Sequence, residues 1–158
     1  MKFRNELPSD GGSKNYLKLK DKESVTGIFM GDIHEFFVVW ENGKSRIVPE
    51  GTPRSSFRFK INFVIKNGSV FEPKIWENGS LVYSQLRELH EEYKLDQIVV
   101  KVTRNGTGMD TTYSVLPLLK QVISPETMAY LQKLELLSLD AKESAHAPSF
   151  QPDDEIPF

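Results

Sequence analysis

The stretch that decides the fold lies near the middle of the chain, from Phe57 to Lys66, and reads FRFKINFVIK. Its odd-numbered residues are all apolar, whereas its even-numbered residues include three cations and no acid. Side chains alternate between the two faces of a β-strand, so this pattern predicts a strand with one face in a core. The other face is expected to present Arg58, Lys60 and Lys66 to the surroundings.

Toward the N-terminus, a second stretch rich in β-branched and aromatic residues runs from Val25 to Trp40 and predicts a long strand. Gly31-Asp32 marks a bend or bulge within it. Asn42-Gly43 is typical of a type I′ hairpin turn, and residues 45–48 form the returning strand. The proline- and glycine-rich residues 49–56 predict a loop before the central strand.

Toward the C-terminus, Asn67-Gly68 predicts a turn into a strand over Val70–Trp76. Ser80 is then expected to cap a helix, because apolar residues recur at helical spacing after it, at Val82, Leu86, Leu89 and Tyr93. Two more strands follow, over residues 97–104 and 111–118. Ser124-Pro125-Glu126 begins a last, short helix that is expected to reach about Leu137.

This order of elements predicts a mainly β protein with an OB-fold, a five-stranded Greek-key barrel with one helix between its third and fourth strands. Six or seven predicted strands exceed five, and long strands that bend would account for the excess. We expect a flexible N-terminus over residues 1–13, the barrel and its C-terminal helix over 14–138, and a tail over 139–158.

Composition excludes several classes of function. The 158 residues include no Cys, so disulfides and thiolate chemistry are absent. Residues 1–13 are polar and lack the apolar core of a signal peptide, which favours a cytoplasmic protein. His34, His90 and His146 lack metal-ligand spacing, and no phosphate-binding glycine loop precedes a helix. We therefore expect no enzyme, no cofactor, no metal site and no membrane span.

Charge is distributed unevenly along the chain. From Leu139 onward five acidic residues face one basic residue, a net charge of −4, while residues 1–138 hold 19 basic and 17 acidic residues, a net charge of +2. The tail has almost no aliphatic residues before its end, so it is expected to be disordered. It nevertheless closes with two large apolar side chains after three acids, as Asp153-Asp154-Glu155-Ile156-Pro157-Phe158.

That hexapeptide closely resembles the Asp-Asp-Asp-Ile-Pro-Phe tip of bacterial single-stranded DNA-binding proteins. The resemblance implies that residues 153–158 form a docking peptide for replication and repair enzymes of the exonuclease, helicase, primase or clamp-loader type. The chemistry suits that role, because Ile156 and Phe158 can enter an apolar pocket while the carboxylates meet a basic rim.

The body departs from that bacterial family, whose N-terminal strand sequence it lacks. Residues 27–40, GIFMGDIHEFFVVW, and the start of the central strand, Arg58 to Phe63, are instead similar to single-stranded DNA-binding proteins of tailed bacteriophages. This looser resemblance spans roughly residues 14–120. It implies a phage protein that borrowed the docking signal of its host's protein or acquired the same signal independently.

Single strands are held by cations that track the phosphates and by aromatic rings that stack on bases. The cationic candidates are Lys18, Lys20, Arg46, Arg54, Arg58, Lys60, Lys101 and Arg104. The aromatic candidates are Phe37, Trp40, Trp76 and Tyr113. Each ring could equally be a core residue, Phe37 and Trp40 lie on opposite strand faces, and Arg58 and Lys60 could simply lie on a solvated face.

The sequence thus predicts a protein that binds and protects single-stranded DNA during replication, recombination or repair and recruits enzymes through its tip. Two alternatives stay open. One is an RNA-binding barrel, and the other is an adaptor or decoy that engages host enzymes through the tip and binds no nucleic acid.

Overall fold

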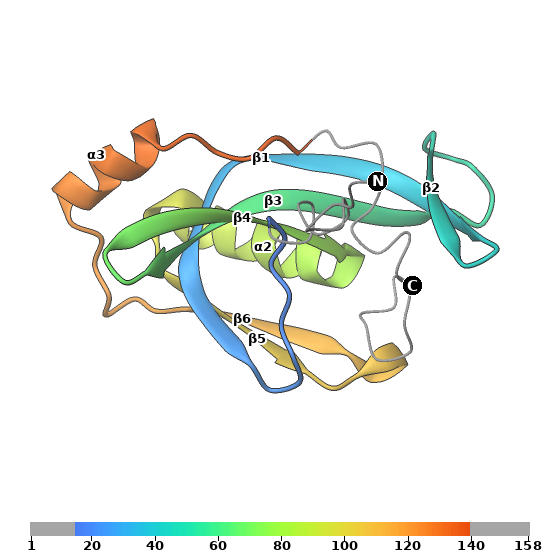
Figure 1. Cartoon of the computed structure of the whole chain (residues 1–158), viewed down its shortest axis with the longest axis horizontal. Helices are drawn as coiled ribbons and strands as arrows, with labels where there is room; N and C mark the ends of the chain where they lie inside the picture. The colour runs from blue at the N-terminus through green and yellow to red at the C-terminus, as the bar shows by residue number, and fades with distance from the viewer. Residues whose placement is uncertain (1–14, 140–158) are drawn as a thin grey trace, which may run out of the picture.

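A computed structural model describes residues 15–139 and shows a mainly β architecture (Figure 1). Its single antiparallel sheet is open, with strand order β4-β3-β1-β5-β6 and with β2 paired to β1. The expectation of a mainly β protein is confirmed. The expected flexible N-terminus and the tail with its tip fall almost wholly outside the described residues.

The strands are β1 (Ser24–Glu41), β2 (Lys44–Val48), β3 (Ser56–Asn67), β4 (Val70–Gly79), β5 (Val100–Asn105) and β6 (Thr112–Pro117). Every strand predicted from the sequence is present. The fourth is longer than expected, because β4 continues past Trp76 and stays paired with β3 as far as Gly79. The hairpin turn at Asn42-Gly43 is confirmed, with positive φ values of 53° and 77° at the two residues.

Two α-helices, α2 (Ser80–Tyr93) and α3 (Pro125–Lys133), accompany the sheet, with short 3₁₀ turns at Leu95–Gln97 and Gly108–Asp110. The sequence predicted that Ser80 caps α2, and this prediction is wrong. Ser80 is the first helical residue, and Gly79 occupies the N-cap position without a side-chain hydrogen bond. Ser124 does cap α3, since its Oγ accepts a hydrogen bond from Thr127 N–H at 3.1 Å. That helix ends at Lys133, one turn earlier than expected.

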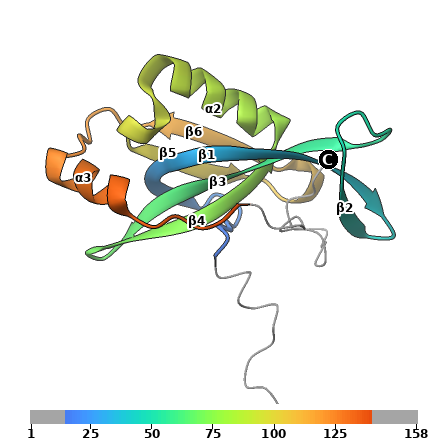
Figure 2. The same cartoon turned by 90° about the horizontal axis from the view of Figure 1, so that it is seen from above.

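The long strand β1 curves through the whole molecule and contacts three other strands (Figure 2). A bulge between Met30 and His34 interrupts its register with β3 and supplies the expected bend. Beyond the bulge, β1 continues with β2 as a projecting hairpin. We call residues 39–55 the arm, and it lies at the opposite end of the molecule from α3 (Figures 1 and 2).

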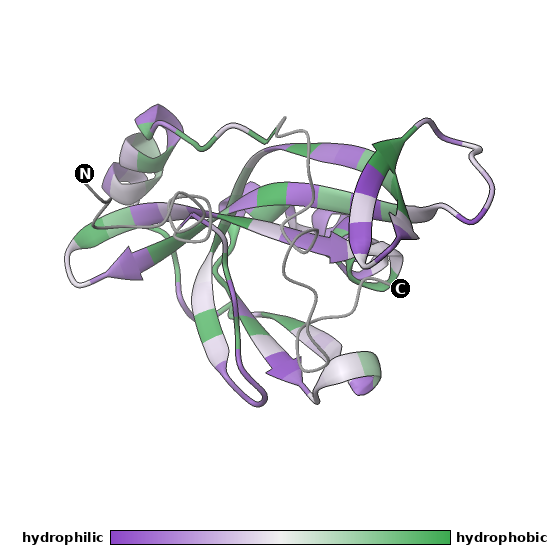
Figure 3. Ribbon diagram, turned by 45° about the vertical axis from the view of Figure 1, so that its right-hand side comes forward, coloured by the Kyte–Doolittle hydropathy of each residue, from purple (hydrophilic) through white to green (hydrophobic). Residues whose placement is uncertain are grey.

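The inner face of the sheet packs on α2 and forms the main core. It buries Phe29, Phe59, Ile61, Phe63, Trp76, Leu86, Val100 and Val102. These residues include three of the five odd positions of the central strand. The other two, Phe57 and Ile65, are partly buried against them, so the predicted apolar face is confirmed. The alternation is visible as bands of opposite hydropathy along the strands (Figure 3).

The outer face of the sheet has a smaller core of its own, formed where α3 covers β1 and β3. Leu131 of α3 packs there with Ile28, Met30 and Val64. The chain after α3 is then fixed to the same face, because Asn62 Nδ2 donates to Leu137 O at 3.0 Å and Leu137 N donates to Asn62 Oδ1 at 2.9 Å. Residues 134–137 thus lead the chain onto the outer face.

Residues 15–19 lie along the outer edge of β4. Tyr16 forms a parallel bridge with Ile75, whose N–H donates to Asn15 O at 2.7 Å. Leu19 enters the main core, and its carbonyl accepts a hydrogen bond from Arg104 at 2.8 Å. No helix in the described part of the chain is long and apolar enough to cross a membrane.

Candidate nucleic-acid interface

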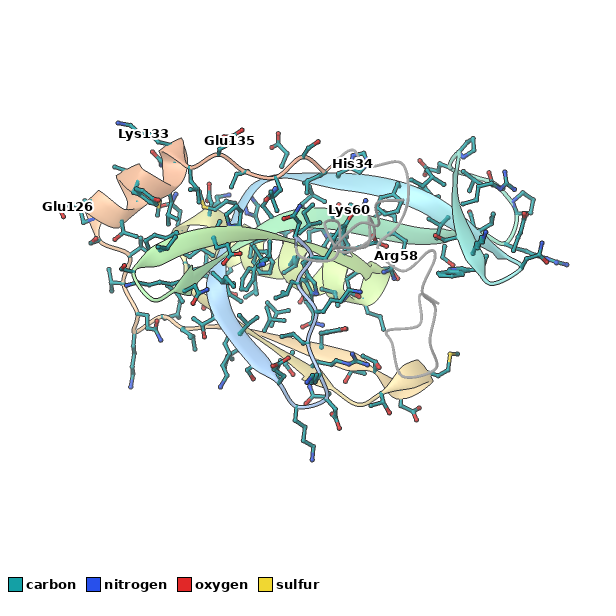
Figure 4. The ribbon with its side chains drawn as sticks, viewed as in Figure 1. His34, Arg58, Lys60, Glu126, Lys133 and Glu135 are labelled. Atoms are coloured by element: carbon teal, nitrogen blue, oxygen red, sulfur yellow. The ribbon has the colours of Figure 1, made fainter. Side chains whose placement is uncertain are left out.

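The outer face of β1, β3 and β4 gathers several of the predicted site residues. The register places Lys60 of β3 between His34 of β1 and Glu77 of β4, and places Arg58 opposite Phe36. Arg58 and Lys60 therefore do point away from the main core, as the alternation predicted. Figure 4 shows them on β3 beside His34.

The expectation that these two cations are open to solvent is wrong. Arg58 is 2% exposed and Lys60 is 0% exposed. Arg58 Nε lies 3.2 Å from Glu77 Oε2, and the two side chains form a buried ion pair. Glu77 was not predicted as a site residue, although a strand extended by one residue would have placed it opposite Lys60. Arg58, Lys60 and Glu77 together form what we call the charged cluster.

Aromatic rings surround Lys60. Its Nζ lies 5.4 Å from the ring centroid of Phe36 and 5.7 Å from that of Tyr16, which are cation–π distances. Burial, together with the carboxylate of Glu77, raises the pKa of Tyr16 to about 12. Tyr16 therefore stays a neutral phenol over Lys60 at physiological pH. Its role is not visible from sequence spacing, because it lies 44 residues before Lys60.

The structure distinguishes the two neighbouring aromatic candidates of β1. Trp40 has the same strand parity as Phe36 and Val38, so it belongs to the outer face and is half-buried there. Phe37 belongs to the inner side, where its ring packs edge-on against Phe57 with centroids 5.6 Å apart. Trp40 is therefore the ring placed on the same face as Arg58 and Lys60.

Trp76 is a core residue and not a stacking platform, which corrects the sequence prediction. It is 1% exposed, its ring lies 5.9 Å from that of Phe29, and it points inward from β4 with Ile61 as its cross-strand neighbour. Tyr113 of β6 packs edge-on against Trp76 at 5.5 Å. Tyr113 is only half-buried, so one part of it borders the surface.

The prediction that Arg104 contacts DNA is also corrected, because Arg104 is 7% exposed and its side chain binds backbone carbonyls. Its guanidinium donates to the carbonyls of Leu19 and Gly106 at 2.8 and 3.2 Å. Lys18, Lys20 and Lys101 are exposed. Lys101 pairs with Thr26 on the opposite end of β1, so the predicted cations do not form one continuous surface.

Two predicted cations are exposed on the arm. Arg46 of β2 is exposed at 63% of its side chain and makes a surface ion pair with Glu41 at 3.0 Å. Arg54 is exposed in the loop between β2 and β3, with a φ of 63° in the left-handed region. Lys44, which the sequence analysis did not select, is exposed at the hairpin turn. The arm thus carries three exposed cations, and the register places Arg46 opposite Val39, on the Phe37 side of β1 and not on the Trp40 side.

The described residues contain no group of three or more acidic or histidine side chains that could hold a metal ion. Comparison with known protein families, with curated proteins and with solved structures gave no match.

Proposed function

We propose that the chain binds single-stranded DNA with little sequence preference, along the outer face of β1 and β3 and onto the arm. The observation that carries this proposal is the joint placement of Trp40, Arg58 and Lys60 on one sheet face, next to the arm that carries the exposed Arg46 and Arg54. A protein holds single-stranded DNA through aromatic rings on which the bases stack and through cations that lie along the phosphates.

We further propose that the fold is an OB barrel in which β1, β3, β4, β5 and β6 are the five principal strands and β2 is an addition. The position of α2, between the third and fourth of these strands, supports this. The five also neighbour one another in a single antiparallel sheet, with α2 packed on its inner face.

The exposed and buried cations have different roles in this proposal. Arg46 and Arg54 contact phosphates directly, since a surface ion pair such as Arg46–Glu41 contributes little and exchanges easily. Arg58 and Lys60 are buried on the outer face and are held by Glu77, Phe36 and Tyr16. The charged cluster contains two cations and one carboxylate, so its net charge is positive. Because the cluster is buried, salt screens its attraction for phosphates less than it screens that of surface charges.

The proposal includes recruitment of replication or repair enzymes through residues 153–158, in the cytoplasm of a bacterial host. Support for this part comes from the resemblance of the tip. It also comes from Asn62, which holds Leu137 against the outer face, so that the tail begins beside the proposed DNA surface.

A paired substitution tests the arm. Arg46→Gln with Arg54→Asn removes two exposed cations, and Asn tolerates the left-handed backbone at position 54. The control pair, Lys120→Gln with Lys133→Gln, removes two exposed cations at the α3 end. Fluorescence anisotropy with a labelled poly-pyrimidine strand should show about tenfold weaker binding for the arm pair alone, with a shallower salt dependence. Equal losses in the two pairs would reject the arm as the contact surface.

A further inference from the structure

A pocket of about 400 Å³ opens where α2 begins and lies between β3, β4 and β6. Its walls come from Arg58, from residues 78–82 at the start of α2, and from residues 111–113 at the start of β6. A cavity of this size falls in the range of small-ligand sites. Arg58 belongs both to this pocket and to the charged cluster, so the pocket adjoins the outer face.

The start of α2 brings positive potential to the pocket. In the described residues no side chain caps the helix, and its first turn contains no acidic residue. The backbone N–H groups of a first turn have no partner within the helix and favour an anion. The guanidinium of Arg58 adds to this, because its Nη1 lies 3.6 Å from the position that a Cβ on Gly79 would take.

A second and independent observation points to a ligand with acceptor atoms. Asn78 lines the pocket and is only 8% exposed. Its Oδ1 accepts from Gly79 N–H at 2.8 Å, but its buried Nδ2 has no acceptor among the described residues. The hydroxyl of Tyr113, on the facing wall, is likewise buried without a partner there. Buried donors of this kind are rare in folded proteins, because each costs free energy.

We propose that this pocket binds one nucleotide of the DNA strand, with its phosphate at the start of α2. The phosphate oxygens accept from the first-turn N–H groups and from Asn78, while Leu81, Val82 and the ring of Tyr113 contact the sugar and base. The proposal rests on the proposed function for the identity of the strand. A nucleotide is favoured over a peptide carboxylate, because the pocket shares Arg58 with the outer face that the proposed function assigns to the DNA strand.

The test compares two acidic substitutions in the full chain. Asn78→Asp keeps the acceptor for Gly79 N–H and places a carboxylate where the helix favours negative charge, so the fold should be retained. Ser80→Asp places an acid in the first turn and should raise the melting temperature. Gln132→Glu, on α3, changes the net charge equally at a distant exposed position and serves as the control.

Two-dimensional NMR titrations with thymidine 5′-monophosphate, inorganic phosphate and unphosphorylated thymidine supply the readout. We expect saturable shifts at the Asn78 side-chain amide and at the amides of residues 80–82 with the monophosphate, and none there with thymidine. Asn78→Asp and Ser80→Asp should each weaken monophosphate binding about tenfold or more, whereas Gln132→Glu should not.

The inference is overturned if the monophosphate leaves these amides unshifted. It is also overturned if a short apolar peptide with a C-terminal carboxylate shifts them and the monophosphate does not. Anisotropy with a poly-pyrimidine strand separates this inference from the proposed function. Unchanged strand affinity in both acidic variants rejects the pocket alone. Monophosphate shifts without any strand binding support the pocket as a nucleotide site and reject the proposed function.

Discussion

Single residues on the outer face carry charges that a folded protein rarely buries. Arg58 and Glu77 form an ion pair whose side chains are 2% and 1% exposed. Glu77 also lies opposite Lys60, so removing Glu77 would leave two buried cations without their carboxylate. Glu77 therefore stabilises the fold, whatever else the charged cluster does.

Glu77→Ala should lower the free energy of unfolding by about 3–5 kcal/mol, because Arg58 and Lys60 would keep buried charges. The triple substitution Arg58→Met, Lys60→Met and Glu77→Leu should cost clearly less than Glu77→Ala. Urea denaturation measures both. As a control, Arg46→Ala breaks an exposed pair and should cost less than about 1 kcal/mol. A triple variant as unstable as Glu77→Ala would contradict this explanation.

Gly27 shows a different constraint, since β3 crosses β1 very closely at this residue. A Cβ there would meet the Val64 carbonyl and lie 2.9 Å from Cζ of Phe63. Gly27→Ala should destabilise the protein by about 1–3 kcal/mol through overpacking. Thermal denaturation beside Thr26→Ala, a neighbour whose side chain is exposed, should show the difference. Equal melting temperatures for Gly27→Ala and Thr26→Ala would mean that β3 can move away from a Cβ at position 27 without loss of stability, and would contradict the prediction.

Local alternation in the sequence identified which residues share a face, but not what covers that face. The odd and even positions of 57–66 were assigned correctly from their period of two. The burial of Arg58 and Lys60 was missed because their partners are distant in sequence: Glu77 comes from the next strand, Phe36 from β1 and Tyr16 from the segment before β1. Composition alone cannot report such pairings.

At the scale of elements, the segment 15–19 is fixed to the sheet edge and places Tyr16 over Lys60. The pKa of Tyr16 is raised to about 12 by burial and by Glu77. The folded state therefore holds the phenolic proton more tightly than the unfolded state, whose pKa is about 10. The stabilising effect is complete below pH 10 and declines as pH rises toward 12.

Tyr16→Phe should accordingly reduce the loss of stability between pH 10 and pH 12, since it removes the group that titrates. Chemical denaturation at pH 9 and at pH 11.5, in wild type and variant, measures the difference. Tyr130→Phe is the control, because Tyr130 of α3 is 50% exposed. If wild type and Tyr16→Phe lose stability equally, Tyr16 does not hold this segment as a neutral phenol.

Element boundaries were predicted less well than element types, for reasons visible at α2. Ser80 has the chemistry of an N-cap, but β3–β4 pairing continues to Gly79 and sets the helix start one residue earlier. The same extension of β4 pairs Glu77 and Asn78 with residues of β3. Strand pairing between residues distant in sequence therefore determines which residue is the N-cap of α2, although Ser80 has the higher local preference for that position.

For the whole molecule, the outer face joins three parts: α3 at one end, the charged cluster in the middle and the arm at the other. The DNA contacts and the docking tip remain predictions. If the acidic tail competes with DNA for this face, as the resemblance of its tip implies, deleting residues 139–158 should tighten binding of a single strand. Neutralising Asp153, Asp154 and Glu155 should produce part of the gain. Anisotropy at low salt measures both, and unchanged affinity would remove the competition.

The most direct test of the central claim is a titration of intrinsic tryptophan fluorescence with a poly-pyrimidine strand and with duplex DNA at several salt concentrations. Trp76 is 1% exposed in the core, so any quenching by a ligand should come from Trp40 on the outer face. We predict saturable quenching by the single strand only, weaker at higher salt and lost in Trp40→Phe. No response and no binding at low salt, with the tail present or removed, would contradict the proposal that this face binds single-stranded DNA.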